Sequence, residues 1–191
     1  MGRKFDPAIK DLLLSEERAQ RFDRYEFLRS IGVDKGKTVA DLGCGPGFFT
    51  LPLAELVGPT GQVYAVDVQQ EMVDELRRRL AEQNITNVAV RRSTELEPGI
   101  PTGTVDVALL GFVLLEIDQR SQFLLAAKRL LKPGGKIAVL EWYPIETPVG
   151  PPLDAKILAD EVIADADAAG LKLVDQRSPH EWHYLLLFEP R

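Results

Sequence analysis

A glycine-rich segment and two acids, each at the end of an apolar segment, carry the most chemistry in this sequence. Residues 43–47 have the sequence Gly-Cys-Gly-Pro-Gly and follow the apolar segment 38–42. Glycine permits the positive φ angles and the close backbone approach that a ligand-binding turn needs. Asp41 lies two residues before the first glycine, and Asp67 ends the next apolar segment. An acid at the second position can bind the diol of a ribose, so the pattern predicts a nucleoside site.

The glycine spacing favours one nucleoside cofactor over another. Dinucleotide binding uses Gly-x-Gly-x-x-Gly, whereas here the third glycine, Gly47, comes one residue early and Phe48 stands in the last glycine position. A carboxylate such as Asp41 is unfavourable beside a pyrophosphate and favourable beside an ammonium or sulfonium cation. An adenosine that carries a cation and no phosphate is S-adenosylmethionine. We therefore expect this cofactor, with a tight turn that binds no ligand as the alternative.

Strands and helices alternate along the chain around these motifs. Most of the predicted strands are near-continuous in Val, Ile, Leu and Ala, which is typical of parallel strands covered on both faces. The last two are joined near Pro179 by a connection too short for a crossover helix, so they must be antiparallel. We expect a Rossmann-like, doubly wound α/β sheet, mostly parallel, with helices on both faces. The predicted strands are 38–42, 62–66, 88–91, 105–110, 136–142, 172–176 and 182–188, with helical stretches at 22–31, 72–80, 123–131 and 158–169.

Length and composition limit the class of protein. The chain has 191 residues, with 23 Lys and Arg against 29 Asp and Glu, for a net charge of -6. This length suits a single domain, and the acidic balance argues against a broad nucleic-acid surface. One cysteine excludes an internal disulfide framework and a cysteine-cluster metal site, so we expect no metal. The basic residues that could still form a local face for RNA are Lys4, Arg18, Arg21, Arg24 and Arg29.

The expected domain occupies residues 1–191, and its segments differ in composition. No apolar run approaches the roughly 20 residues of a membrane span, and the N-terminus lacks the apolar stretch of a secretory signal. We therefore expect a cytoplasmic protein with no membrane partner. The segments are an arm and helix (1–35), a cofactor-binding core (36–142), a proline-rich loop (143–157), and a helix with an antiparallel strand pair (158–191).

Four segments in the same order resemble the class I S-adenosylmethionine-dependent methyltransferases. They are residues 39–50, Asp67, residues 105–112 and residues 130–137. The resemblance spans about residues 36 to 190. It implies a seven-stranded sheet of order 3-2-1-4-5-7-6 with strand seven antiparallel. It also implies S-adenosylmethionine as methyl donor and S-adenosylhomocysteine as product.

The resemblance implies cofactor contacts position by position. Ser93 replaces the usual acid of the turn at the adenine edge, so contact with the adenine amino group would come from backbone or from Glu95. Leu115 stands where many relatives have histidine. The implied contacts are Leu42, Gly43 and Gly45 to the methionine part with Asp41 nearby, Asp67 to the ribose, Val68 and Met72 beside adenine, Ser93, Thr94 and Glu95 at the adenine edge, and Gly111 with Phe112 from strand four.

Candidate acceptor residues follow from the crevice expected at the carboxyl ends of the parallel strands. Glu141 closes strand five, and the reversed strand seven brings its first residues, including His183, to the same edge. Either side chain could act as a general base if the acceptor is a hydroxyl or a protonated amine. The structural alternatives are a solvated edge histidine and a hydrogen-bonded strand-end acid. The further candidates for substrate contact are Glu116, Tyr143, His180 and Trp182.

These observations predict an S-adenosylmethionine-dependent methyltransferase that acts by direct displacement. The charge favours a small-molecule acceptor, whose identity the sequence does not give. An RNA or protein methyltransferase is an alternative, and a non-catalytic protein that binds S-adenosylmethionine is another. Residues 5–14 and 144–152 are the candidate lids over the crevice.

Overall fold

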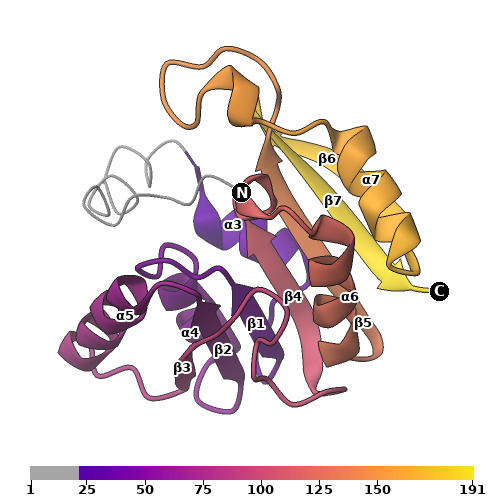
Figure 1. The fold of residues 1–191 in the computed structure, drawn as a ribbon. Coiled ribbons are helices and arrows are strands. Elements are labelled where there is room, and N and C mark those ends of the chain that lie inside the picture. Colours follow the sequence, from indigo (N-terminus) through magenta and orange to yellow (C-terminus); the bar gives the residue numbers. More distant parts are fainter. Residues whose placement is uncertain (1–21) are drawn as a thin grey trace.

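The computed structural model describes residues 22–191, which form a seven-stranded sheet with helices packed against it (Figure 1). The strand order is β3-β2-β1-β4-β5-β7-β6. β7 is antiparallel to both of its neighbours, and the other pairs are parallel. This confirms the predicted fold and strand order. The strands are β1 (Thr38–Leu42), β2 (Gln62–Asp67), β3 (Val88–Arg92), β4 (Val105–Gly111), β5 (Leu131–Trp142), β6 (Leu171–His180) and β7 (His183–Pro190).

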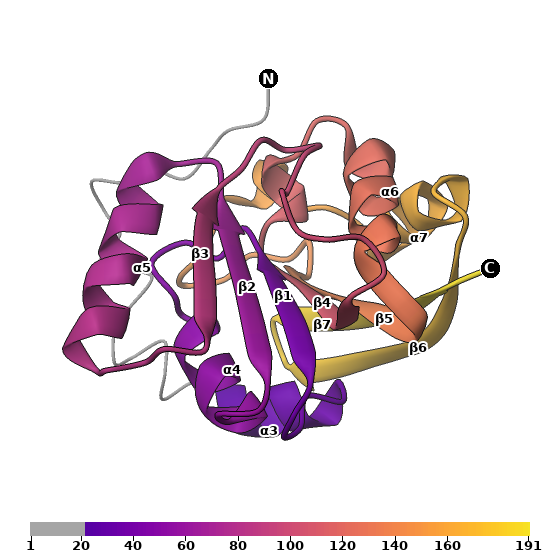
Figure 2. The ribbon, with the colours of Figure 1, turned by 90° about the horizontal axis from the view of Figure 1, so that it is seen from below.

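Helices cover both faces of the sheet (Figure 2). One face packs against α3, α4 and α5, and the opposite face packs against α6 and α7. The connection from β3 to β4, residues 93–104, contains turns and bends but no helix. The helices are α3 (Arg24–Ser30), α4 (Thr50–Val57), α5 (Gln70–Glu82), α6 (Arg120–Leu130) and α7 (Ala159–Ala168), with short 3₁₀ turns η2 (Leu114–Glu116) and η3 (Leu153–Ala155).

Strand alternation divides the core into two layers. In β5, Ile137 and Val139 belong to the cluster under α6 and α7, whereas Ala138 and Leu140 belong to the cluster under α3 and α4. Successive side chains of a strand point to opposite faces, so each covered face needs its own apolar set. This requirement explains why the central strands are apolar at nearly every position.

β5 begins earlier than predicted. The sequence predicts the strand from residue 136, after a helix end marked by Pro133-Gly134-Gly135, but β5 starts at Leu131. The reason is a pairing between Leu131 and Val105, followed by a register shift before Val107. A Cβ at Gly135 would lie 2.8 Å from the carbonyl oxygen of Val105, so glycine permits this close approach.

The turn between β6 and β7 also differs from the prediction. It lies at residues 181–182 instead of near Pro179, which is part of β6. Proline lacks the N–H of a ladder bond and is tolerated there because β6 is an edge strand. Trp182 therefore belongs to the turn and not to β7, while the predicted antiparallel pairing is confirmed.

The predicted leading helix, 22–31, appears as the shorter α3. Asp23 caps it, since its Oδ1 accepts the N–H of Glu26 at 2.9 Å. The arm before it, including the candidate lid at residues 5–14, lies outside the described residues. Across residues 22–191, the structure has no helix with the length and apolar character needed to cross a membrane.

Candidate functional site

The backbone N–H groups of the glycine loop are directed into the protein. Gly43 and Cys44 both donate to the carbonyl oxygen of Val66, at 2.8 and 3.0 Å. Gly45 donates to Oδ2 of Asp67 at 2.9 Å, and Gly47 closes a turn on the carbonyl oxygen of Cys44 at 3.0 Å. Pro46 has no N–H. Anion binding by a glycine loop needs N–H groups that point at the ligand, so this loop is not arranged for a pyrophosphate.

Glycine is required in this loop by conformation and by space. Gly43, Gly45 and Gly47 have φ angles of 76°, 51° and 95°. A Cβ on Gly43 would lie 2.4 Å from Cγ2 of Val113, which approaches from the end of β4. The loop is thus enclosed between the ends of β2 and β4.

Asp41 lies behind the loop as a buried acid. Its side chain is 2% exposed, and Oδ2 accepts a hydrogen bond from the Thr50 hydroxyl at 2.6 Å. Burial raises the pKa of Asp41 to about 7, with a smaller contribution from the negative charge of Asp67 and an opposing one from the Thr50 bond. A cationic ligand at the loop would favour the ionised form of both acids.

Asp67 joins the loop to the end of β2. Its Oδ1 accepts the N–H of Gln69 at 2.9 Å, opposite the bond from Gly45 to Oδ2. The carbonyl oxygen of Asp67 accepts the N–H of Ser93 at 2.9 Å, which brings the start of the 93–104 connection to the same edge. The carboxylate thus lies at the carboxyl end of β2, next to the glycine loop.

The predicted adenine-side residues surround this point. Met72 is buried in the first turn of α5, and Val68 is half-buried just after β2. Thr94 is exposed and accepts the N–H of Glu97 through its hydroxyl, while Ser93 and Glu95 are half-buried. The structure thus brings together the ends of β1, β2 and β3, as the family pattern implies.

The end of β4 completes the edge beside the loop. A Cβ on Gly111 would lie 2.6 Å from the Phe49 ring, so only glycine fits there. Phe112 has a φ of 63°, which is strained for a residue with a bulky side chain. Its N–H donates to the carbonyl oxygen of Leu140 at 2.8 Å. Strain of this kind at a strand end is typical of functional sites.

His183 lies in an aromatic cluster at the ends of β5 and β7. It is 6% exposed and is paired directly with Trp142 across the two strands. Its ring centroid is 4.3 Å from that of Trp142, 4.9 Å from Phe112 and 5.8 Å from Phe22. The reversed direction of β7 thus brings His183 to the edge at which β5 ends, while its role at a cofactor or acceptor stays a prediction.

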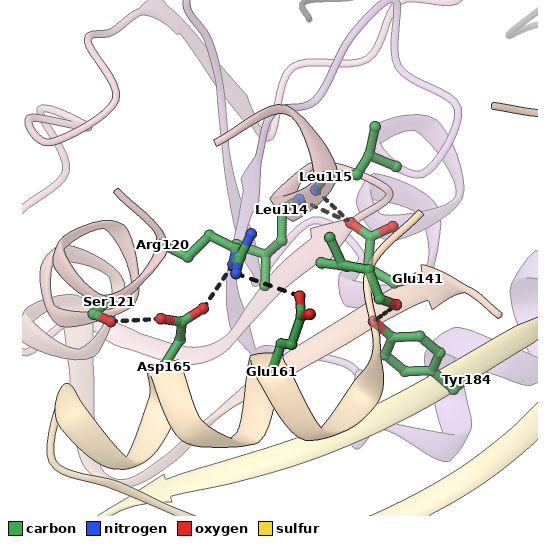
Figure 3. Close-up of polar contacts among 9 residues, drawn as sticks. Leu114, Leu115, Arg120, Ser121, Glu141, Glu161, Asp165 and Tyr184 are labelled. Carbon is green, nitrogen blue, oxygen red and sulfur yellow. Dashed lines mark hydrogen bonds and ion pairs between the residues drawn. The ribbon is translucent and has the colours of Figure 1, made fainter. Parts of the chain in front are cut away.

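Glu141 caps the turn after β4 (Figure 3). Its Oε1 accepts the N–H groups of Leu114 and Leu115 at 2.8 and 3.4 Å, at the start of η2. The residue is 1% exposed, and Oε2 has no hydrogen-bond partner in the described part of the chain. Burial raises the pKa of Glu141 to about 8 against the opposing effect of backbone hydrogen bonds, with a further increase from Glu116. This raised pKa favours the protonated carboxyl at neutral pH.

Glu141 and His183 lie on opposite faces of the sheet. Glu141 is paired with Tyr184, on the face of α6 and α7, whereas His183 is paired with Trp142, on the face of α3 and α4. Directly opposed residues of an antiparallel pair share a face. The two candidate bases consequently do not form a dyad.

Three of the four other candidates for contact with the methyl acceptor lie near the β6–β7 turn. His180 and Trp182 have ring centroids 5.1 Å apart, and the N–H of Tyr143 donates to the carbonyl oxygen of Trp182 at 2.8 Å. The Tyr143 hydroxyl lies 2.5 Å from the hydroxyl of Ser178. Glu116 lies apart from them, in η2.

The proline-rich loop folds over Trp142. Lys156 is 9% exposed and donates to the carbonyl oxygen of Ile145 at 2.6 Å and to the Thr147 hydroxyl at 2.7 Å. Its ammonium lies 5.3 Å from the centroid of the Trp142 ring, and burial lowers the pKa of Lys156. A Cβ on Gly150 would lie 2.6 Å from the same ring. The loop is therefore fixed at the edge of the aromatic cluster.

The structure bears on three other kinds of chemistry, namely a cysteine nucleophile, an RNA-binding face and a metal site. Burial raises the pKa of the Cys44 thiol, so this side chain is a poor nucleophile. Arg24 donates to the carbonyl oxygen of Phe48 at 3.0 Å and stacks on that ring, so it is engaged in the fold. Arg29 is exposed, and the other three basic residues lie outside the described part of the chain. Residues 22–191 contain no cluster of metal-ligating side chains.

Sequence reasoning missed two contacts that shape the site. Thr50 is wholly buried as the partner of Asp41, and its place in the first turn after the glycine loop was the available clue. Val113 closes the space beside Gly43, and nothing in its local sequence indicates this contact.

A family model described as a methyltransferase domain matches residues 39–135. The crystal structure of an S-adenosylmethionine-dependent methyltransferase from Aquifex aeolicus has a TM-score of 0.93 with 31% sequence identity, covering 97% of this chain and 98% of that one. A second structure, a putative type 11 methyltransferase from Sulfolobus solfataricus, has a TM-score of 0.75 at 22% identity, covers 90% of this chain and 94% of its own, and shows the shared fold.

Curated relatives match over a shorter range. A demethylmenaquinone methyltransferase from Geobacillus sp. (strain WCH70) is 32% identical over 118 residues, which is 62% of this chain and 50% of the relative. The enzyme of the same name from Anoxybacillus flavithermus is 30% identical over 118 residues, with the same coverage. The chain thus spans about half the length of these curated relatives.

Proposed function

Because this chain belongs to the family of S-adenosylmethionine-dependent methyltransferases, we propose that it transfers a methyl group from S-adenosylmethionine to a small-molecule acceptor. The cofactor supplies an already activated methyl group on a sulfonium cation. The protein then has to hold the donor, align the acceptor and exclude water.

The orientation of the glycine loop is the observation that carries this proposal. All its N–H groups are satisfied within the protein, and Asp41 and Asp67 stand behind and beside it. The two carboxyl groups supply negative charge at the loop, which fits an ammonium and a sulfonium. In this proposal Asp67 binds the ribose, Val68 and Met72 flank adenine, and Gly111 leaves space at the end of β4.

The acceptor is proposed to lie between the end of β4 and the β6–β7 turn. The net charge of -6 favours a small molecule over RNA, and two relatives are named for methyl transfer to demethylmenaquinone. The proposed contacts are Tyr143, His180, Trp182 and Glu116. Residues 144–152 are proposed as the lid over this region, and a cytoplasmic location stays part of the proposal.

Two side chains are candidate bases for an acceptor that must lose a proton. His183 shares the face of Phe112 and Trp142, whereas Glu141 is enclosed beneath η2 on the other face. We propose His183 as the base for a hydroxyl acceptor, with Glu141 second. Full turnover by both His183→Ala and Glu141→Gln on an identified acceptor would contradict any base in this site.

A transfer assay with methyl-labelled S-adenosylmethionine tests the proposed activity. The acceptors supplied would be demethylmenaquinone, a small-molecule extract, total RNA and total protein, each with the wild-type enzyme and with Asp67→Ala. Label in a small-molecule fraction, lost in the variant, is the expected result. Label in RNA or protein alone would establish the alternative methyltransferases. Tight cofactor binding with no label in any fraction would establish a non-catalytic binding protein.

A further inference from the structure

The turn between β4 and η2 forms one wall of the glycine loop. Val113 is the residue that reaches Gly43, since a Cβ built there would lie 2.4 Å from its Cγ2. The preceding residue, Phe112, holds a φ of 63° and donates its N–H to the carbonyl oxygen of Leu140. The wall therefore depends on a backbone conformation that the surrounding structure has to maintain.

Glu141 fixes the other end of this turn. Its Oε1 accepts two consecutive backbone N–H groups, from Leu114 at 2.8 Å and from Leu115 at 3.4 Å. These groups begin η2, where no residue of the turn supplies a side-chain cap. The carboxyl is buried, and Glu141 follows Leu140 in the sequence. The end of β5 therefore binds the turn through Leu140 at its first residue and through Glu141 at its last residues.

We infer that Glu141 is a positioning residue for the cofactor, acting through the β4–η2 turn on the glycine loop. The inference rests on the proposed function, because that function places the cofactor at the loop. This role differs from that of a general base. It requires at position 141 a side-chain oxygen that accepts hydrogen bonds, and it involves no proton transfer. In this positioning role the carboxyl would touch neither the cofactor nor the methyl acceptor, whereas the second-choice role as base would require contact with the methyl acceptor.

Two substitutions distinguish the effect of the hydrogen-bonding oxygen of Glu141 from the effect of its side-chain volume. Glu141→Gln keeps an oxygen for the N–H groups of Leu114 and Leu115, whereas Glu141→Leu fills similar space without one. The readout is the dissociation constant of S-adenosylhomocysteine, measured by calorimetry at pH 7. We expect Gln to bind within about threefold of the wild type and Leu to bind at least about tenfold more weakly, because two buried donors lose their partner.

Tyr184→Phe is the matched control for stability. Tyr184 is paired with Glu141 across β5 and β7, and its hydroxyl donates to the carbonyl oxygen of Ile157 at 3.2 Å, away from the turn. This variant should lose stability and keep the wild-type dissociation constant. If Glu141→Leu does not fold, Val113→Ala tests the same wall at a half-buried position and should also weaken binding several-fold.

Wild-type affinity in Glu141→Leu would overturn the inference, as would wild-type affinity in Val113→Ala where the Leu variant does not fold. Equal weakening in Gln and Leu would overturn it too, because the acceptor oxygen would then be irrelevant. If the wild type binds neither S-adenosylhomocysteine nor S-adenosylmethionine, the proposed function itself fails and the inference falls with it. These results are distinct in a single series of titrations.

Discussion

Gly45 donates its backbone N–H to Oδ2 of Asp67, 2.9 Å away and 22 residues later in the chain. This bond joins the glycine loop to the end of β2 without any ligand. It also removes an N–H group that a phosphate would need. This arrangement supports the proposal that the loop binds a ligand that carries positive charge and a ribose.

The first prediction concerns Gly43. Replacement by alanine would introduce strain at a φ of 76° and place a Cβ against Val113. We expect a loss of about 2–4 kcal/mol of stability, together with loss of cofactor binding. Gly103→Ala is the control, because its φ is 67° but no atom lies within 4 Å of the new Cβ. It should cost only about 1 kcal/mol, and equal costs in urea unfolding would contradict the role of Val113.

The second prediction concerns proton release on cofactor binding. The pKa of Asp41 is raised to about 7, mainly by burial, so the carboxyl is partly protonated at neutral pH. A cation bound at the loop should lower this pKa and release protons into the buffer. Calorimetric enthalpies of S-adenosylmethionine binding at pH 7 should therefore vary with the ionisation enthalpy of the buffer. This dependence of the binding enthalpy on the buffer should be smaller in Asp41→Asn. An equal dependence in the variant would show that another group releases the protons.

The third prediction is a pH dependence of stability from Glu141. Its pKa is raised from 4.5 to about 8, so between these values the native carboxyl is protonated and the unfolded one is ionised. The native state then binds the extra proton, and this contribution to stability is complete below pH 4.5 and is lost as pH rises toward 8. The slope is about 1.4 kcal/mol per pH unit within the window. The stability of Glu141→Gln relative to the wild type should thus rise from pH 5 to pH 8, and a constant difference in urea unfolding would refute the shift.

The fourth prediction separates stability from binding. Asp165 accepts hydrogen bonds from Arg120 and Ser121, at 2.6 and 2.8 Å, and so ties α7 to α6 (Figure 3). Because this pair is three-quarters buried, Asp165→Ala should cost about 1–2 kcal/mol of stability. Asp74→Ala removes an exposed pair with Arg77 and should cost under about 0.5 kcal/mol. Neither change should alter cofactor affinity, and a weaker cofactor titration with Asp165→Ala would show that α7 contributes to the site.

The sequence was sufficient for elements with a strong local pattern. The seven strands, the glycine loop and the reversed β7 follow from apolar runs and from the length of one connection. The predicted ends of strands were wrong where pairing with a distant strand determines them. Leu131, for example, pairs with Val105, so β5 begins earlier in the chain than predicted. Trp182 was placed in β7 because its local pattern continues the apolar run, although it lies in the turn.

The sequence predicts which strand ends carry the candidate residues, but not which face of the sheet each side chain lies on. Strand direction is enough to predict that His183 lies at the edge where β5 ends. The opposite faces of Glu141 and His183 depend on the register of β5 with β7, which the chain alone did not specify. The bond from Gly45 to Asp67 and the contact of Val113 with Gly43 join distant segments, so no local pattern could reveal them.

We propose that the glycine loop binds a cationic adenosine and not a dinucleotide. Calorimetric titration of the wild type and of Asp67→Ala with S-adenosylmethionine, S-adenosylhomocysteine and NAD distinguishes the two ligands. We expect the wild type to bind the first two, with an affinity at least about tenfold lower in the variant, and not to bind NAD. Binding of NAD in preference to both would show that the loop is a dinucleotide site.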